Sequence, residues 1–216
     1  MIKNEFIKRV FSSLILIPIV FFVIIEGSIL FNFFISICLV ITAYEWLQMS
    51  KANIQKIFGL FFIIISFYSI FKIRNDFNQD YFHISLIAII CISTDTGGYI
   101  FGKLLKGPKL TKLSPKKTYA GMLGSFLLSI TVTIIFFNLT SKIYNFKYTE
   151  ETFIFVLLVS LVSQIGDIII SYFKRLSKIK DTGNIIPGHG GILDRIDGMI
   201  FAFPFSYLVF LNWNFQ

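Results

Sequence analysis

The sequence predicts an all-α integral membrane protein, a polytopic helical bundle. Of its 216 residues, 55% are hydrophobic and only 15% are charged, whereas soluble domains carry about 25% charged residues. The mean hydropathy is +0.76. Backbone polar groups in lipid must be satisfied within their own segment, so the recurring apolar runs are expected to be helices. The loops are too short for a separate domain, and residues 1–216 are interpreted as a single transmembrane domain.

About seven apolar runs approach the length of roughly 20 residues that a bilayer-crossing helix needs. They are residues 10–25, 28–47, 57–71, 82–101, 121–139, 153–173 and 199–215. The first run follows a basic head, but no small-residue cleavage site comes after it, so we expect an uncleaved span rather than a signal peptide.

The basic residues predict the orientation of these spans. Among the 20 Lys and Arg residues, all but Lys72, Arg74, Lys142 and Lys147 fall at the N-terminus or after the second, fourth and sixth spans. The positive-inside rule then places the N-terminus and the loops 102–120 and 174–198 in the cytoplasm. Orientation and anionic lipid account for the net charge of +8, and no nucleic-acid partner is expected, because no soluble recognition element carries that charge.

Two acids lie at membrane depth, where a charge costs about 2.5–3.5 kcal/mol on insertion scales. Asp95 shares a helix face with Cys91, Gly98 and Gly102, a small-residue face that a neighbouring helix could approach closely. A packing seam with one tolerated acid is the alternative interpretation. By contrast, Glu45 lies near the end of its span and is expected to reach the interface.

Asp167 stands in a polar stripe with Ser163, Ser171 and Lys174, which lie along one face of the predicted helix. The stripe leads directly into the loop 174–198. An ion path through Asp95 and Asp167 would indicate a transporter, but such a path predicts acids throughout both leaflets rather than near one face.

The two cytoplasmic loops carry groups suited to phosphate. Loop 102–120 contains four residues that can donate hydrogen bonds to phosphate oxygens, Ser114, Lys116, Lys117 and Thr118. The loop does not have the residue spacing of a P-loop. In loop 174–198, Lys174, Arg175, Lys178 and Lys180 are followed by the glycines of GHGG, where backbone amides can approach a ligand closely. His189 within that motif is as often structural as catalytic.

Asp194 and Asp197 are three residues apart and would share a helix face if the last span begins there. Carboxylates in a cationic loop form a plausible site for Mg²⁺, which takes one or two carboxylates plus substrate phosphates. The residues therefore favour magnesium-dependent phosphoryl or nucleotidyl transfer at the cytoplasmic face.

The order of residues in this loop resembles the signature of the phosphatidate cytidylyltransferases (CDP-diacylglycerol synthases). The matching positions are Ser171, Lys174–Arg175, Lys180–Asp181, Gly183, Pro187, His189–Gly190–Gly191, Asp194–Arg195 and Asp197. The segments DTGGYIFGK, LSPKKT and SQIGD also look like the family's. The family usually has Glu where this chain has Ile170, and an aromatic residue followed by an acid or amide where it has Tyr119–Ala120.

The resemblance implies an enzyme that converts CTP and phosphatidate into CDP-diacylglycerol and pyrophosphate in phospholipid biosynthesis. It implies a catalytic membrane region over residues 82–216, preceded by N-terminal spans over 1–81, in the plasma (inner) membrane. Asp167, Asp194 and Asp197 are expected to hold Mg²⁺, with a second cation left open, and Lys174 and Arg175 to act with them in catalysis. Expected substrate-binding residues are Asp95, Ser114, Lys116, Lys117, Thr118, Ser171, Lys180, Asp181, His189, Gly190, Gly191 and Arg195.

Two further alternatives remain at this point. A CTP-dependent lipid kinase acting on a polyprenol or diacylglycerol would transfer the γ-phosphate and release CDP. A CDP-alcohol phosphotransferase would need an aspartate spacing that the sequence does not contain. The oligomeric state is open, and small-residue helix faces permit a homodimer.

Overall fold

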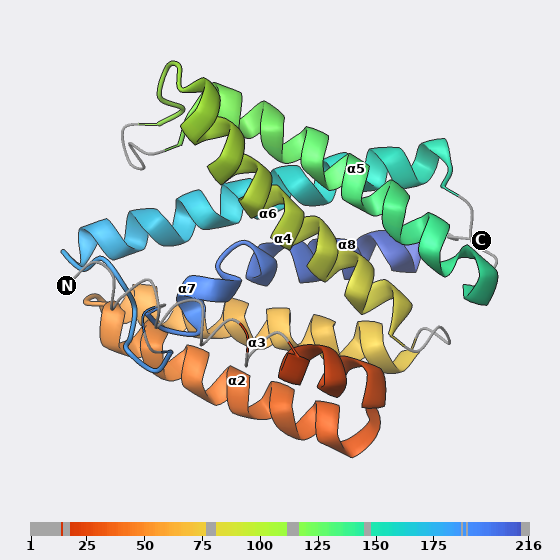
Figure 1. Ribbon diagram of the computed structural model, residues 1–216. Helices are drawn as coiled ribbons and strands as arrows, with labels where there is room; N and C mark the ends of the chain where they lie inside the picture. Colours follow the sequence, from red (N-terminus) through yellow and green to blue (C-terminus); the bar gives the residue numbers. More distant parts are fainter. Residues whose placement is uncertain are drawn as a thin grey trace. The chain divides into compact units, whose positions relative to one another are not determined.

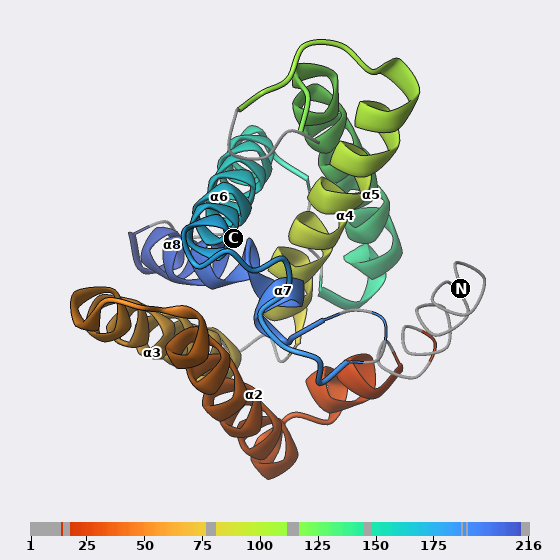
Figure 2. The same cartoon turned by 90° about the vertical axis from the view of Figure 1, so that its left-hand side faces the viewer.

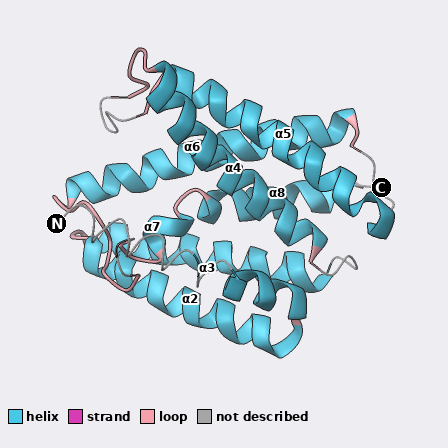
Figure 3. Cartoon of the chain, viewed as in Figure 1, coloured by secondary structure: helices cyan, strands magenta, loops and turns pink. Residues whose placement is uncertain are grey.

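The described part of the chain is helical, which confirms the predicted fold class (Figure 3). The computed structural model describes residues 14, 18–76, 81–111, 117–144, 148–186, 188 and 190–212. Across these residues the only β-type pairings are two isolated bridges, Lys109 with Thr118 and Ile186 with Gly190.

Five of the described helices are long and apolar enough to cross a membrane. They are α2 (Ser28–Met49), α3 (Asn53–Asp76), α4 (Phe82–Leu105), α5 (Tyr119–Tyr144) and α6 (Glu150–Leu176), followed by the short α7 (Leu193–Ile196) and the shorter apolar α8 (Met199–Asn212) (Figure 1). These five correspond to the second to sixth predicted spans. The first predicted span lies largely outside the described residues, with 18–26 helical, so the count of seven stays a prediction.

Hydroxyl side chains begin two of the long helices. Thr118 Oγ1 accepts a hydrogen bond from the Gly121 N–H (3.0 Å) at the start of α5. Thr149 Oγ1 accepts one from the Thr152 N–H (3.3 Å) at the start of α6. Both satisfy a backbone donor that has no partner within its own helix. Helix α6 also has acids in its first turn and bases in its last, which suits the helix dipole.

The chain forms two compact units, each with its own packing. Unit 1 contains Met1–Tyr81 and Phe173–Asp197, and unit 2 contains Phe82–Tyr172 and Gly198–Gln216. Helices α2 and α3 lie side by side in unit 1, and α4 and α5 lie side by side in unit 2 (Figures 1 and 2).

Glycines let α4 and α5 approach each other closely in unit 2. A Cβ on Gly97 would lie 2.5 Å from the Gly124 carbonyl oxygen, which real Cβ atoms do not tolerate. Buried hydroxyls then link neighbouring helices: Ser125 donates to the Thr94 carbonyl oxygen (2.7 Å), and Thr94 Oγ1 donates to Ser160 Oγ (2.8 Å). Gly98 and Gly102, from the small-residue face that the sequence predicts on α4, also lie next to Gly121 of α5, whereas Asp95 on that face is exposed.

The end of α2 organises unit 1. The Trp46 side chain is buried, donates to the Gln55 carbonyl oxygen (3.1 Å) and meets the Phe173 ring edge-on, with centroids 5.1 Å apart. One turn later, the Met49 carbonyl oxygen accepts a hydrogen bond from Ser177 Oγ (2.6 Å). These contacts fix the last turn of α6 and the start of the following loop against α2.

We expect Gly97→Ala to destabilise the protein by about 1–3 kcal/mol, because overpacking of a close helix contact outweighs alanine's better helix propensity. Gly102→Ala is the matched control, since its Cβ would meet the Thr118 hydroxyl at 3.2 Å and Gly121 Cα at 3.6 Å, and a smaller loss is expected there. Thermal unfolding in one detergent, followed by circular dichroism, measures both. A Gly97→Ala variant as stable as the wild type would contradict the close contact.

Candidate active site

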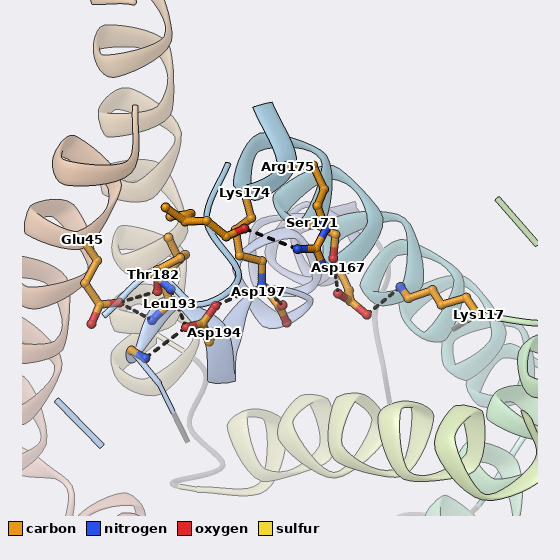
Figure 4. A network of polar contacts seen from close by, with 12 residues as sticks. Glu45, Lys117, Asp167, Ser171, Lys174, Arg175, Thr182, Leu193, Asp194 and Asp197 are labelled. Carbon is orange, nitrogen blue, oxygen red and sulfur yellow. Dashed lines mark hydrogen bonds and ion pairs between the residues drawn. The ribbon is translucent and has the colours of Figure 1, made fainter. Parts of the chain in front are cut away.

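One cluster of predicted site residues, the α6 cluster, consists of Lys117, Asp167 and Ser171 in unit 2 (Figure 4). Lys117 Nζ lies 2.5 Å from Asp167 Oδ2 and donates to the Gln164 carbonyl oxygen at 3.4 Å. Ser171 Oγ donates to Asp167 Oδ1 (3.2 Å), as the spacing of four residues on one helix face predicts. The polar stripe predicted on this helix is therefore present, and it holds the loop before α5 against α6.

The Lys117–Asp167 pair remains accessible, since the two side chains are 23% and 27% exposed. Separating a partly exposed ion pair costs little free energy, because solvent already screens the attraction between its two charges. Both charges are therefore able to exchange their present partner for a ligand.

A second cluster, the loop cluster, consists of Lys174, Asp194 and Asp197 in unit 1. Lys174 Nζ lies 3.0 Å from Asp194 Oδ1 and 3.6 Å from Asp197 Oδ2, and Figure 4 shows the lysine reaching toward both carboxylates. The two aspartates thus share one ammonium group, as expected if both project from the same side of the chain that enters α8. Their charges need such a cation, because the three side chains are largely buried.

Backbone donors also hold Asp194. Its Oδ2 accepts hydrogen bonds from the N–H groups of Thr182 (2.7 Å) and Gly191 (3.0 Å). Burial alone would raise the pKa of Asp194, but the two N–H groups and the Lys174 ammonium outweigh it and hold the pKa below its ordinary value. Asp194 is therefore a fixed negative charge that also closes the loop between α6 and α7.

Residues 177–192 form this loop, which is called the α6–α7 loop below. It contains a tight turn, in which the Ile186 N–H donates a hydrogen bond to the Gly190 carbonyl oxygen (2.9 Å). Gly188 and Gly190 have φ angles of 77° and 87°, a conformation that costs side-chain-bearing residues about 1–2 kcal/mol. The turn therefore requires glycine at both positions for its backbone shape.

The structure adds a residue that the sequence-based site did not include. Glu45 on α2 is only 2% exposed, so the prediction that it reaches the interface was wrong. Its carboxylate accepts hydrogen bonds from Thr182 Oγ1 (3.1 Å), the Ile192 N–H (3.0 Å) and the Leu193 N–H (2.8 Å). The local sequence shows only an acid near the end of an apolar run, which gives no sign of these distant partners.

The remaining predicted site residues have varied surroundings. Thr118 caps α5 through its oxygen, which leaves its hydroxyl hydrogen able to donate. Arg175 is exposed and donates to the Ile179 carbonyl oxygen at 3.4 Å. Also exposed are Asp95, Lys180, Asp181 and Arg195. Ser114, Lys116 and His189 lie outside the described residues.

The carboxylates fit a hard divalent cation by chemistry, since Mg²⁺ takes carboxylate oxygens together with substrate phosphates. Among the residues that the structure describes, no three His, Cys, Asp or Glu side chains gather closely enough to hold a metal ion by themselves. In the loop cluster a lysine ammonium already stands between two carboxylates. The donor set thus suits a metal held partly by its substrate, rather than a protein-only cage.

The apolar helices indicate a helical membrane protein, and each of its two units contains one carboxylate–lysine cluster. Comparison with known sequences gives the family. The profile described as "Cytidylyltransferase family" matches residues 52–213, a region that contains both clusters but not Glu45. The chain belongs to the cytidylyltransferase family, which confirms the resemblance drawn from the signature.

Three similar proteins carry the same name. The phosphatidate cytidylyltransferase of Rickettsia bellii (strain RML369-C) is 34% identical over 213 residues, covering 96% of this chain and 91% of the relative. That of Rickettsia conorii (strain ATCC VR-613 / Malish 7) is 35% identical, covering 96% and 92%. That of Brucella melitensis biotype 1 is 32% identical, covering 85% and 66%.

The lowered pKa of Asp194 predicts how its contribution to stability depends on pH. A carboxyl with a depressed pKa stabilises the folded state at any pH above its pKa in the unfolded chain, which is 3.8. This contribution is lost as the pH falls through the lower pKa of the folded state. We therefore expect the difference in unfolding temperature between the wild type and Asp194→Asn to stay constant between about pH 8 and about pH 5. A difference that already narrows between about pH 7 and about pH 5 would contradict the assignment.

Proposed function

We propose that this protein is a phosphatidate cytidylyltransferase, a nucleotidyltransferase of phospholipid biosynthesis that transfers CMP from CTP to phosphatidate. The observation that carries the proposal is the family signature, Ser171 to Asp197, within a chain similar over nearly its whole length to relatives of that name. The membrane helices support it further, because one substrate is a lipid.

The reaction needs no nucleophile from the protein. A phosphate oxygen of phosphatidate attacks the α-phosphorus of CTP, and the bond between the α-phosphorus and the bridging oxygen of the β-phosphate breaks. The products are CDP-diacylglycerol and pyrophosphate. Catalysis of such a transfer rests on positioning and on stabilising negative charge.

Asp167, Asp194 and Asp197 are proposed to bind Mg²⁺ together with the CTP phosphates. Bound there, the cation would neutralise charge on the triphosphate and on the departing pyrophosphate. Each of these carboxylates lies next to a lysine in the structure. Lys117 and Lys174 then become available for phosphate oxygens when a divalent cation takes over the carboxylates, and Arg175, Lys180 and Arg195 add positive charge nearby in the sequence.

The remaining predicted site residues keep supporting roles in the proposal. Asp95 orients a lysine or completes the metal site, and Ser171 keeps Asp167 oriented. The segment from Ser114 to Thr118 covers the nucleotide or holds the lipid phosphate. Asp181 and the GHGG residues His189, Gly190 and Gly191 contact substrate from the α6–α7 loop.

The membrane arrangement that we propose has seven spans, with the N-terminus and the charged site on the cytoplasmic side of the inner membrane. The two proposed spans beyond the five long helices are residues 10–25 and 199–215, which include the helical residues 18–25 and α8, respectively. The bacterial relatives support an inner-membrane location. CTP would reach the site from the cytoplasm and phosphatidate from the bilayer, and a homodimer through small-residue helix faces is compatible with this arrangement.

The proposal is tested with the purified protein in detergent, Mg²⁺, CTP and labelled phosphatidate. We expect labelled CDP-diacylglycerol and pyrophosphate, and a rate at least about 100-fold lower for Asp167→Asn and for Asp194→Asn, because each removes a carboxylate proposed to hold the Mg²⁺ that stabilises charge on the reacting phosphates. Asp76→Asn, which breaks only the α3 pair with Lys72, serves as the control and should leave the rate unchanged.

Two outcomes would contradict this proposal. Release of CDP with a phosphorylated lipid, when a polyprenol or diacylglycerol replaces phosphatidate in the assay, would indicate a CTP-dependent lipid kinase. Rates near the wild-type value for both aspartate variants at saturating Mg²⁺ would remove these carboxylates from the site.

A further inference from the structure

The α6–α7 loop depends on a carboxylate outside the signature. Glu45 lies on α2, more than 130 residues before the loop, with Thr182 at a sequence separation of 137 and Leu193 at 148. It accepts three hydrogen bonds at 2.8–3.1 Å from the loop and from the start of α7. Three donors from two stretches of the chain thus converge on one buried carboxylate, so this contact is a principal restraint on the loop.

Thr182 joins the buried Glu45 to Asp194. Its N–H donates to Asp194 Oδ2 (2.7 Å), and its hydroxyl donates to Glu45 Oε2 (3.1 Å). Ile192 and Leu193, which donate to Glu45, immediately precede Asp194 in the chain. A shift of the Glu45 carboxylate would therefore move the backbone on which Asp194 stands.

Two glycines of the loop border the same carboxylate. A Cβ on Gly183 would come within 2.8 Å of Glu45 Oε1, and a Cβ on Gly191 would overlap the Glu45 carboxylate. Neither glycine has a φ angle that excludes side chains. Their lack of a side chain is thus explained by the space that Glu45 occupies, and the loop sequence is matched to a residue on α2.

We propose that Glu45 is a positioning residue of the active site: its buried carboxylate holds Thr182 and the chain entering α7, and thereby sets the position of Asp194. This inference rests on the proposed function for the identity of the reaction. Glu45 contacts no substrate in this proposal. It acts through Asp194 and through the glycine turn, so the N-terminal helix α2 belongs to the catalytic apparatus as well as to the membrane anchor.

The test compares Glu45→Gln with the wild type. The substitution keeps size and shape but replaces one accepting oxygen with an N–H₂ group, which cannot accept from the donors that face it. We expect the concentrations of CTP and Mg²⁺ for half-maximal activity to rise about 10- to 100-fold, the range typical for residues that orient metal ligands. Glu26→Gln, the same change at an exposed position before α2, should change neither.

A double-mutant cycle with Thr182→Val tests the pathway. Removing the hydroxyl breaks the link to Glu45 and leaves the backbone N–H bond to Asp194. If Glu45 acts through Thr182, the two substitutions together raise the half-maximal concentrations by less than the product of their separate effects. Fully multiplicative effects would overturn this link.

A second readout is independent of activity. Trypsin cleavage after Lys180 and Arg195 in the detergent-purified protein should be faster for Glu45→Gln than for Glu26→Gln, because the loop has lost its restraint. A Glu45→Gln variant that shows only a lower maximal rate, in proportion to less folded protein, with unchanged half-maximal concentrations would overturn the positioning role.

Failure of the proposed function gives a different pattern. A wild-type protein that folds but makes no CDP-diacylglycerol would contradict the reaction and the role of Glu45 in it. The trypsin comparison would still test whether Glu45 holds the loop in place. An unchanged cleavage rate in Glu45→Gln would contradict that role too.

Discussion

Two carboxylates that accept hydrogen bonds from one stretch of backbone determine the shape of the α6–α7 loop. Glu45 binds Thr182, Ile192 and Leu193, while Asp194 binds Thr182 and Gly191. The loop has no regular secondary structure in which its N–H groups could find backbone acceptors, so the two carboxylates accept their hydrogen bonds instead. The glycine turn and the charged side chains of the signature depend on this restraint.

Charge balance explains why so many ionisable residues are tolerated near apolar helices. Lys117 neutralises Asp167, and the single Lys174 ammonium is shared by Asp194 and Asp197. A buried carboxylate without a partner would cost several kcal/mol, so the largely buried contacts of Lys174 with Asp194 and Asp197 matter more for folding than the partly exposed Lys117–Asp167 pair. In the proposed function, a charged substrate and its cation would exchange partners with the same pairs.

Much of the fold and part of the site follow from the sequence. Hydropathy predicts the five long helices, because bilayer thickness fixes their length, and helix spacing predicts the Ser171–Asp167 bond. Glu45 escapes prediction because its partners lie far away in the chain and its burial depends on tertiary packing. The pairing of Lys117 with Asp167 is likewise a long-range contact that no local pattern encodes.

Amide hydrogen exchange of the detergent-solubilised protein tests the central claim most directly. If the two carboxylates hold the loop, the N–H groups of Thr182, Gly191, Ile192 and Leu193 exchange far more slowly than those of the exposed neighbours Lys180 and Asp181. In Asp194→Asn and Glu45→Gln, protection is lost at the amides that each carboxylate binds. Rapid exchange at all four amides in the wild type would contradict the claim.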